Sequence, residues 1–388
     1  MSSIPPFIPG MELSRLYFIE AVQPILDQHF PGLVYSAGRL DFGSDVLGFD
    51  TPMSRDHDWG PRLMLFVAEE ELDTRRDDIL RCLSKNLPVQ IHGYPTHFEN
   101  FNSDGTHLQI VEQGPVDPYI SVISPERFVL GYAGVDITRP LTVADWLVIP
   151  WQRLATIRAG HVFHDGLNRF IELKALLHWY PQDVWLYALA AGWRHIDQEE
   201  PFMGRTADAG DELGSRILTA RLLNRLMQLC FLLERRWPPY SKWFGSAFAG
   251  LDCAAALQPL FLRASESRDW QTRQTALSEL YIHICSIHNK TGITAYVAPE
   301  ITPFYTRPFQ VPHAQRYADA LYAAIQSEEV LALPRYAGSI DQFVQNIDVL
   351  ESIPLCRHLR HFYQSPPEAH LPDPCPHVDA RHLKEKQP

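Results

Sequence analysis

Residues 37–62 read AGRLDFGSDVLGFDTPMSRDHDWGPR, and the rest of the chain is organised around this stretch. It contains the pair Gly43-Ser44 and then two aspartates one residue apart, Asp56 and Asp58, before the apolar run 63–68. Side chains alternate faces along a strand, so a strand through both aspartates predicts their carboxylates on one face. Adjacent carboxylates repel each other unless a cation lies between them, and Mg²⁺ prefers such oxygen ligands. The order indicates a phosphate-binding turn followed by a metal site.

Length and composition limit the classes of protein to consider. A chain of 388 residues predicts about two domains, and 46% hydrophobic residues supply ample material for their cores. The net charge of -12 argues against a basic DNA-binding surface, so no DNA partner is expected. The 6 cysteines show no metal-binding or disulfide spacing. Neither a signal peptide nor a long apolar window is present, which favours a cytoplasmic protein without membrane contact.

Periodicity divides the chain into two parts. Before residue 140, helical spacing alternates with short β-prone runs, which predicts an α+β domain with a mixed sheet. The expected helices cover 11–30 and 69–87, and the expected strands cover 33–37, the segment with both aspartates, 89–98, 107–111 and 119–123. We therefore expect an α+β domain over 1–140.

From residue 142 onward the spacing predicts helix after helix, giving a mostly helical domain over 141–364. The expected helices cover 151–160, 167–180, 182–196, 211–236, 241–264, 268–288, 313–327 and 340–362. Residues 365–388 are rich in proline and polar side chains, which predicts a disordered tail.

The residue types in the opening stretch suit phosphoryl transfer from a nucleoside triphosphate. Glycine lets backbone amides approach a phosphate closely, and the hydroxyl of Ser44 adds a donor. Asp56 and Asp58 would hold magnesium that bridges the phosphates and neutralises charge on the attacking and leaving oxygens. The same residues also fit a simple turn followed by a solvated strand start.

A second cluster follows the long predicted helix, where Pro238-Pro239 ends it. Lys242 would neutralise a triphosphate and Tyr240 would stack on a base, although both equally fit the start of another helix. Two weaker candidates for substrate contact remain. They are the polar set Arg205, Asp208, Asp211, Glu212 and Arg216, which also fits helix capping, and the pair His288-Asn289.

The motif from Gly43-Ser44 to Asp56-His57-Asp58 resembles the active-site signature of the polymerase-beta-like nucleotidyltransferases. The whole chain looks like a bacterial family in which such a core carries a helical C-terminal domain of unknown function. The segments that carry this resemblance are SRDHDWGPR (54–62), GRTADAGDELGSR (204–216), ERRWPPYSKWFGSAF (234–248) and His288-Asn289.

The resemblance implies a nucleotidyltransferase-like fold and transfer of a nucleoside monophosphate to an acceptor, with release of pyrophosphate. Gly43 and Ser44 match the phosphate-contacting pair, and Asp56 and Asp58 match the magnesium carboxylates. ATP is the expected donor, and the acceptor is an unidentified small molecule, protein or RNA. A third catalytic carboxylate is expected on a later strand, where Glu112 is preferred to Glu99.

Two alternatives stay open at this point. One is a catalytically inactive nucleotide-binding regulatory module, because neither Glu112 nor Glu99 has flanking residues typical of a third carboxylate. The other is a toxin or antitoxin component, since nucleotidyltransferase cores occur in such systems.

Overall fold

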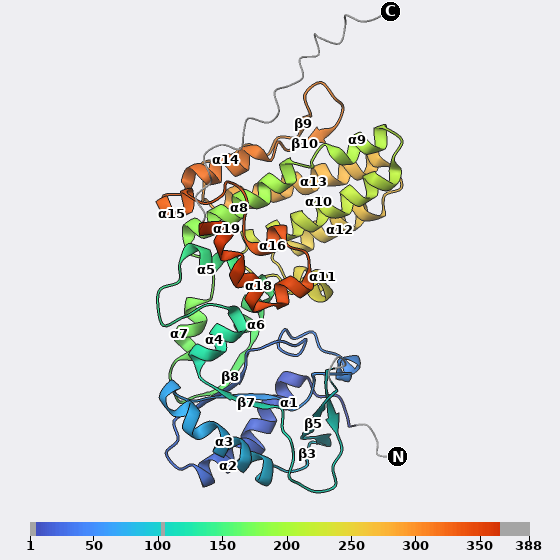
Figure 1. Ribbon diagram of the computed structural model, residues 1–388. Helices are drawn as coiled ribbons and strands as arrows, with labels where there is room; N and C mark the ends of the chain where they lie inside the picture. Colours follow the sequence, from blue (N-terminus) through green and yellow to red (C-terminus); the bar gives the residue numbers. More distant parts are fainter. Residues whose placement is uncertain (1–4, 102–104, 365–388) are drawn as a thin grey trace, which may run out of the picture.

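The structure, a computed structural model, describes residues 5–101 and 105–364. Figure 1 shows two lobes, a lower one built on a small sheet and an upper one of packed helices. The predicted α+β class, with a mixed sheet followed by a mostly helical part, is confirmed. The tail predicted over 365–388 lies outside the described residues.

A four-stranded mixed sheet forms the centre of the lower lobe. In spatial order its strands are β7 (Ile120–Ile123), β2 (Leu63–Phe66), β1 (Ser36–Arg39) and β8 (His161–Asp165). β2 pairs parallel with β7 and antiparallel with β1, which in turn pairs antiparallel with β8. The parallel β2–β7 pair needs a long crossover, and that connection includes the predicted helix α3 (Glu69–Asn86).

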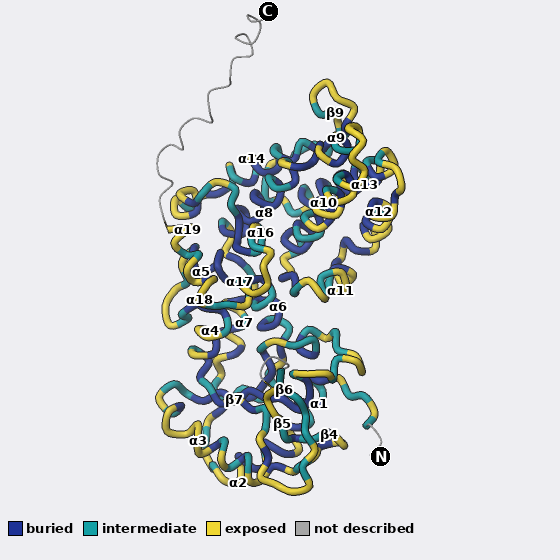
Figure 2. Tube along the Cα trace, turned by 45° about the vertical axis from the view of Figure 1, so that its right-hand side comes forward, coloured by how far each residue is buried: buried dark blue, intermediate teal, exposed yellow. Residues whose placement is uncertain are grey.

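Helices and two small hairpins surround this sheet. They are α1 (Gly10–Tyr17), a π-helical stretch (Phe18–Val22), α2 (Gln23–His29), the 3₁₀ turn η2 (Pro52–Arg55), β3 (Gln90–Ile91) with β4 (Tyr94–Pro95), and β5 (His97–Asn100) with β6 (Thr106–Gln109). Acidic residues in the first turn of α3 complement the helix dipole. Figure 2 shows much of α3 exposed, whereas Leu72, Ile79 and Leu83 are buried in the core with the sheet.

Helices make up most of the upper lobe. They are α4 (Pro125–Ala133), α5 (Val143–Val148), α6 (Trp151–Ala159), α7 (Phe170–Leu176), α8 (Gln182–Asp197), α9 (Phe202–Asp208), α10 (Glu212–Leu233), η4 (Ser241–Trp243), α11 (Phe244–Phe248), α12 (Ala254–Glu266), α13 (Trp270–Lys290), α14 (Gln315–Ala324), α15 (Glu328–Leu331), α16 (Ile340–Phe343), α17 (Ile347–Glu351), α18 (Ile353–His358) and α19 (Arg360–Gln364), with the hairpin β9 (Thr302–Pro303) and β10 (Gln310–Val311). Among the described residues, none of these or the other helices is long and apolar enough to cross a membrane.

Strand β2 is buried on both faces and belongs to two hydrophobic cores. Leu63 and Leu65 lie in the core of the sheet lobe, together with residues of α1 to α3. Met64 and Phe66 lie in the larger core that continues into the helical lobe. The alternation of side chains along one strand therefore joins the two lobes.

Two features of the sheet differ from the sequence-based expectation. The helical pattern after residue 142 concealed β8, a short segment that becomes a strand because it pairs with β1, far away in the sequence. Asp56 and Asp58 do not lie on a strand, since β2 starts only at Leu63. They occupy the bend between η2 and β2, so the strand-alternation argument for their shared face is wrong.

We expect Phe66→Ala to destabilise the whole protein, because the Phe66 ring is fully buried against Phe128 and Phe170. The free energy of unfolding should fall by about 3–5 kcal/mol, as for other buried aromatic truncations. Urea unfolding measures this change. The control is Ile171→Ala on α7, where the side chain is 79% exposed and the loss should stay within about 0.5 kcal/mol. Equal losses in both variants would contradict the shared core.

Glu200 predicts a pH dependence of stability. Its carboxyl accepts a hydrogen bond from the Ala314 backbone N–H at 3.0 Å, and burial raises the pKa of Glu200 from 4.5 to about 8. Between these values the folded state holds a proton that the unfolded state has lost, so stability falls as pH rises from 4.5 through about 8. Urea unfolding across this range should show that Glu200→Gln removes this part of the decline. The exposed Glu172→Gln should leave it unchanged.

Candidate functional site

A pocket of about 620 Å³ lies between the loops of the sheet lobe and the lower end of the helical lobe. Figure 1 shows α6, α11 and α18 at this end, above the loops that follow β1 and precede β2. The pocket brings together six residues singled out from the sequence: Gly43, Ser44, Asp56, Asp58, Tyr240 and Lys242. Residues nearly 200 positions apart thus line one cavity, and their chemical roles stay predictions.

The turn at Gly43 requires a residue without a side chain. Its φ of +141° favours glycine, and a Cβ atom there would lie 2.0 Å from Oδ1 of Asp45. Asp45 itself is buried and accepts a hydrogen bond from Nη2 of Arg39 at 3.1 Å. The backbone N–H of Phe49 donates to the Ser44 carbonyl at 2.8 Å, which closes the turn. A backbone hydrogen bond and the buried ion pair of Arg39 with Asp45 therefore fix the conformation of this turn at the pocket.

Two buried arginines connect this turn with the aspartate segment. Arg39 forms ion pairs with Asp41 and Asp45, and Arg62 pairs with Asp41 at 3.3 Å. Burial alone would lower the pKa of Arg39, but Asp41 and Asp45 outweigh it, so the pKa is raised. The Arg62 guanidinium also donates to the Asp58 carbonyl. A single charged network thus positions both loops.

The segment with Asp56 and Asp58 forms a bend at the edge of the pocket. Asp58 adopts a left-handed conformation with φ of +49°, which is uncommon for a residue with a side chain. Its Oδ1 accepts from the Tyr119 hydroxyl at 3.3 Å, and its Oδ2 lies 3.2 Å from Nδ1 of His57. Nε2 of the same imidazole lies 3.9 Å from Oδ2 of Asp56. The two carboxylates therefore flank one histidine.

The carboxylates suit a magnesium ion that arrives with its ligand. The Asp56 side chain is 67% exposed and that of Asp58 26%. Within the described parts of the chain, no group of three or more His, Cys, Asp or Glu side chains is placed to hold a metal. Mg²⁺ keeps waters and commonly binds through one or two carboxylates plus substrate phosphates. Asp56 and Asp58 fit that pattern and do not form an all-protein metal cage.

The helical wall carries Tyr240 and Lys242 at the turn η4. The Tyr240 hydroxyl accepts from the Trp243 indole at 2.8 Å, and the Trp243 ring stacks on Phe49 of the sheet lobe at 5.4 Å. Burial raises the pKa of Tyr240 above the ordinary value for tyrosine. Lys242 is exposed, with its ammonium 5.2 Å from the Trp243 ring centroid. The stacked pair Phe49 and Trp243 fixes this turn against the sheet lobe.

Three charged residues of the pocket were not predicted from the sequence: Asp45 in the turn after β1, Arg153 on α6 and Glu351 at the end of α17. Nη2 of Arg153 donates to the Glu351 carbonyl at 3.1 Å. Gln152, Arg153 and Thr156 all line the pocket from one helix, so the polar edge of the predicted helix 151–160 was the signal available. Glu351 had no such signal, because only the return of the C-terminal segment brings it there.

Glu112, the predicted third carboxylate, lies elsewhere. It is exposed in the bend after β6 and does not line the pocket. In place of the expected strand 107–111, β6 covers Thr106–Gln109 and pairs with β5 in a hairpin, not with the central sheet. Glu99 on β5 is also exposed and lies 3.8 Å from His97. The third free carboxylate of the pocket is that of Glu351, from the helical lobe.

The other sequence candidates have structural contacts. Asp211 caps α10 by accepting from the Gly214 N–H at 2.7 Å, and Glu212 pairs with Arg216 and with the buried Arg273. Arg205 lies over Phe202 on α9, where Asp208 ends the helix. His288 accepts from the Trp193 indole at 3.2 Å, and Asn289 donates to the Val297 carbonyl at 2.7 Å. These contacts favour roles in the packing of the helical lobe.

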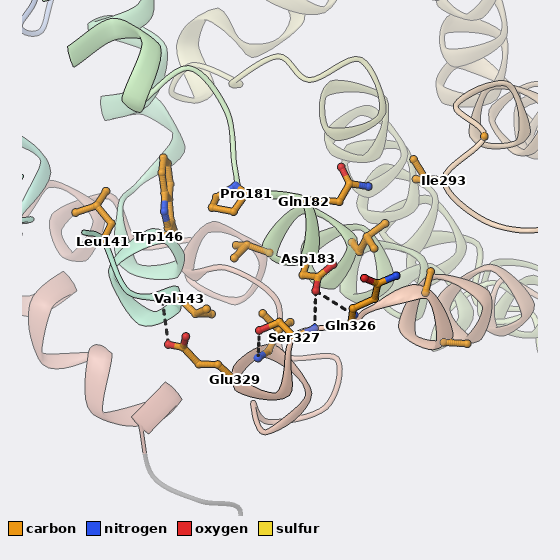
Figure 3. A pocket seen from close by; sticks show the side chains of 16 residues that line it. Leu141, Val143, Trp146, Pro181, Gln182, Asp183, Ile293, Gln326, Ser327 and Glu329 are labelled. Carbon is orange, nitrogen blue, oxygen red and sulfur yellow. Dashed lines mark hydrogen bonds between the residues drawn. The ribbon is translucent and has the colours of Figure 1, made fainter. Parts of the chain in front are cut away.

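A larger cavity of about 920 Å³ lies within the helical lobe, between α5, α8 and the α14–α15 turn (Figure 3). Its acidic groups already have partners. Asp183 accepts from the backbone N–H groups of Gln326 and Ser327, at 3.0 and 2.6 Å, and Glu329 accepts from that of Val143 at 3.3 Å. This cavity contains none of the residues predicted to act on a nucleotide.

A family model described as a domain of unknown function, DUF4037, matches residues 146–244. The match begins in α5 and ends at the start of α11, so it includes Arg153, Tyr240 and Lys242 but neither loop of the sheet lobe. Neither a curated protein nor a solved structure matches the chain. The expected helical domain of uncharacterised function is therefore supported, and the relationship to nucleotidyltransferases stays a prediction.

We expect Arg39→Met to destabilise the protein by about 3–5 kcal/mol, because it leaves the buried Asp45 without its cation. Urea unfolding monitored by circular dichroism gives the value. The matched control is Arg75→Met, which removes an exposed pair with Glu71 at 4.0 Å and should cost less than about 1 kcal/mol. A loss no larger than in the control would contradict the role assigned to the network.

Proposed function

We propose that this protein is a magnesium-dependent nucleotidyltransferase that moves a nucleoside monophosphate from a nucleoside triphosphate to an unidentified acceptor. The observation that carries the proposal is the shared pocket. It places Asp56 and Asp58 together with Gly43-Ser44 on one side, and Tyr240 and Lys242 on the other. The sequence alone predicts that each of these residues contacts a nucleoside triphosphate or its metal ion.

The charges of the pocket support a polyphosphate that binds with a divalent cation. Asp56, Asp58 and Glu351 contribute carboxylates without a paired arginine, whereas Arg153 and Lys242 contribute cations. A free triphosphate would be repelled by three carboxylates, and Mg²⁺ bound to the phosphates would reduce that repulsion. Binding of the nucleotide should therefore depend strongly on Mg²⁺.

In the proposed reaction, each residue has a separate task. Amides of the turn at Gly43 and the Ser44 hydroxyl would contact the phosphates, while Lys242 would neutralise their charge. Asp56 and Asp58 would hold Mg²⁺, which supplies charge neutralisation at the phosphates when bound. An oxygen or nitrogen of the acceptor would attack the α-phosphorus and lose its proton to water. The bond between the α-phosphorus and the oxygen that bridges it to the β-phosphorus would break, and pyrophosphate would leave with that oxygen. ATP is the proposed donor, and the cytoplasm the proposed location.

A nucleotide-binding regulatory module is the second candidate. It is favoured by the position of Glu351, because the pocket's third carboxylate comes from the helical lobe and not from the sheet. Such a module would bind ATP with Mg²⁺ and release no pyrophosphate. Pyrophosphate release and labelling of cell extract from radiolabelled ATP separate the two candidates.

We expect ATP to raise the thermal unfolding midpoint only when Mg²⁺ is present, and Asp56→Asn to abolish that gain. Asp56→Asn should also lower transfer by roughly 100-fold or more, because charge neutralisation at the phosphates is lost. The Asp56 side chain is largely exposed, so the fold should be unaffected. Differential scanning fluorimetry and a radiolabel assay measure the two effects.

The matched control is Asp77→Asn, which changes an exposed aspartate on α3 outside the pocket. It should keep both the metal-dependent midpoint gain and any transfer. A second variant, Asp58→Asn, should behave as Asp56→Asn does toward ATP. Retention of the metal-dependent gain in both pocket variants would refute the magnesium assignment.

A further inference from the structure

Arg153 is held in a fixed orientation at the helical wall of the pocket. Its guanidinium lies over the Tyr132 ring, 4.5 Å from the ring centroid, and Nη2 donates to the Glu351 carbonyl at 3.1 Å. The Tyr132 hydroxyl is hydrogen-bonded to Oγ1 of Thr156 at 2.7 Å, so the ring beneath the guanidinium is fixed as well. The planar group therefore needs little ordering when a ligand binds.

Arg153 has no carboxylate partner among the described residues. Its Nε is buried and has no hydrogen-bond partner within the described residues, and no carboxylate among them lies within ion-pair distance. The buried Nε is closed to solvent, as are those of Arg39 and Arg62, so only the terminal nitrogens of Arg153 can meet a ligand. An anion in the pocket would supply the opposite charge that this guanidinium lacks.

The other cations near the pocket are less suitable for this role. Arg39 and Arg62 are already paired with Asp41, and Arg39 with Asp45 too. Lys242 is exposed and carries its charge on a flexible stem. A guanidinium presents two parallel N–H donors to a phosphate, which adds geometric selection to the charge.

We propose that Arg153 binds the β- or γ-phosphate of the nucleoside triphosphate and makes the pocket selective for polyphosphates over monophosphates. The inference rests on the proposed function, since it assigns a residue to the same ligand. A triphosphate with Mg²⁺ would contact the carboxylates through the metal ion and Arg153 through a terminal phosphate, whereas a monophosphate has no β- or γ-phosphate for Arg153 to bind. Arg153 of the helical lobe would thus distinguish ligands by the number of their phosphates.

Isothermal titration calorimetry with Mg²⁺ and ATP, ADP or AMP tests the proposal. Arg153→Gln should weaken ATP binding by about 10–100-fold, the usual range for a lost hydrogen bond to a charged group, and leave AMP binding unchanged. Arg153→Lys should lose part of the ATP affinity, because it keeps the charge without the paired donors. Inorganic tripolyphosphate with Mg²⁺ should follow the ATP result.

The matched control is Arg158→Gln on the same helix. Arg158 donates to the Arg235 carbonyl at 2.9 Å and does not line the pocket, so ATP affinity should match that of the wild type. Thermal unfolding of all variants shows whether a loss of ATP affinity is caused by misfolding. If Arg153→Gln does not fold, Arg153→Lys is used for the test in its place.

Two results would overturn the assignment. One is wild-type ATP affinity in Arg153→Gln. The other is an equal loss for AMP and ATP, which would place Arg153 against the nucleoside or the acceptor. If the wild-type protein binds no nucleotide but binds tripolyphosphate through Arg153, the proposed function fails and the polyphosphate site stands.

Discussion

The structure depends on the burial of strand β2 on both faces. Leu63 and Leu65 pack into one hydrophobic core, while Met64 and Phe66 pack into the other. Burial of apolar area is the main stabilising contribution in folding, so neither lobe can lose this strand without losing part of its own core. Because the aspartate segment leads directly into β2, the position of the candidate site is set by the same packing.

The charged network of Arg39, Arg62 and Asp41 orients the two loops that line the pocket. Arg39 and Arg62 are both nearly inaccessible to solvent and share Asp41, so the loops before β2 and after β1 are tied to one another. Buried ion pairs contribute modestly to net stability, but their geometry is restrictive. The network joins the turn at Gly43 to the segment of Asp58.

Sequence patterns predicted the structure correctly where interactions between residues close in the chain determine it. Helix α3, the α+β class and the pocket position of Gly43 and Asp56 follow from short-range periodicity and motif spacing. Prediction failed where pairing between distant segments decided the structure: β8 is a strand because β1 lies beside it. Glu112 follows the β5–β6 hairpin and does not line the pocket, and its catalytic role stays a prediction. Arg153 required knowledge of which face of α6 meets the other lobe.

The return of the chain to the sheet has a consequence for synthesis on the ribosome. The Ser36 hydroxyl donates a hydrogen bond to Asp165, which lies 129 positions later in the chain. Arg153 donates to the carbonyl of Glu351, which is synthesised later still. Domains generally fold as units while the chain emerges, and long-range pairing slows folding. A nascent chain that has not yet reached Glu351 therefore lacks part of the lining of the pocket.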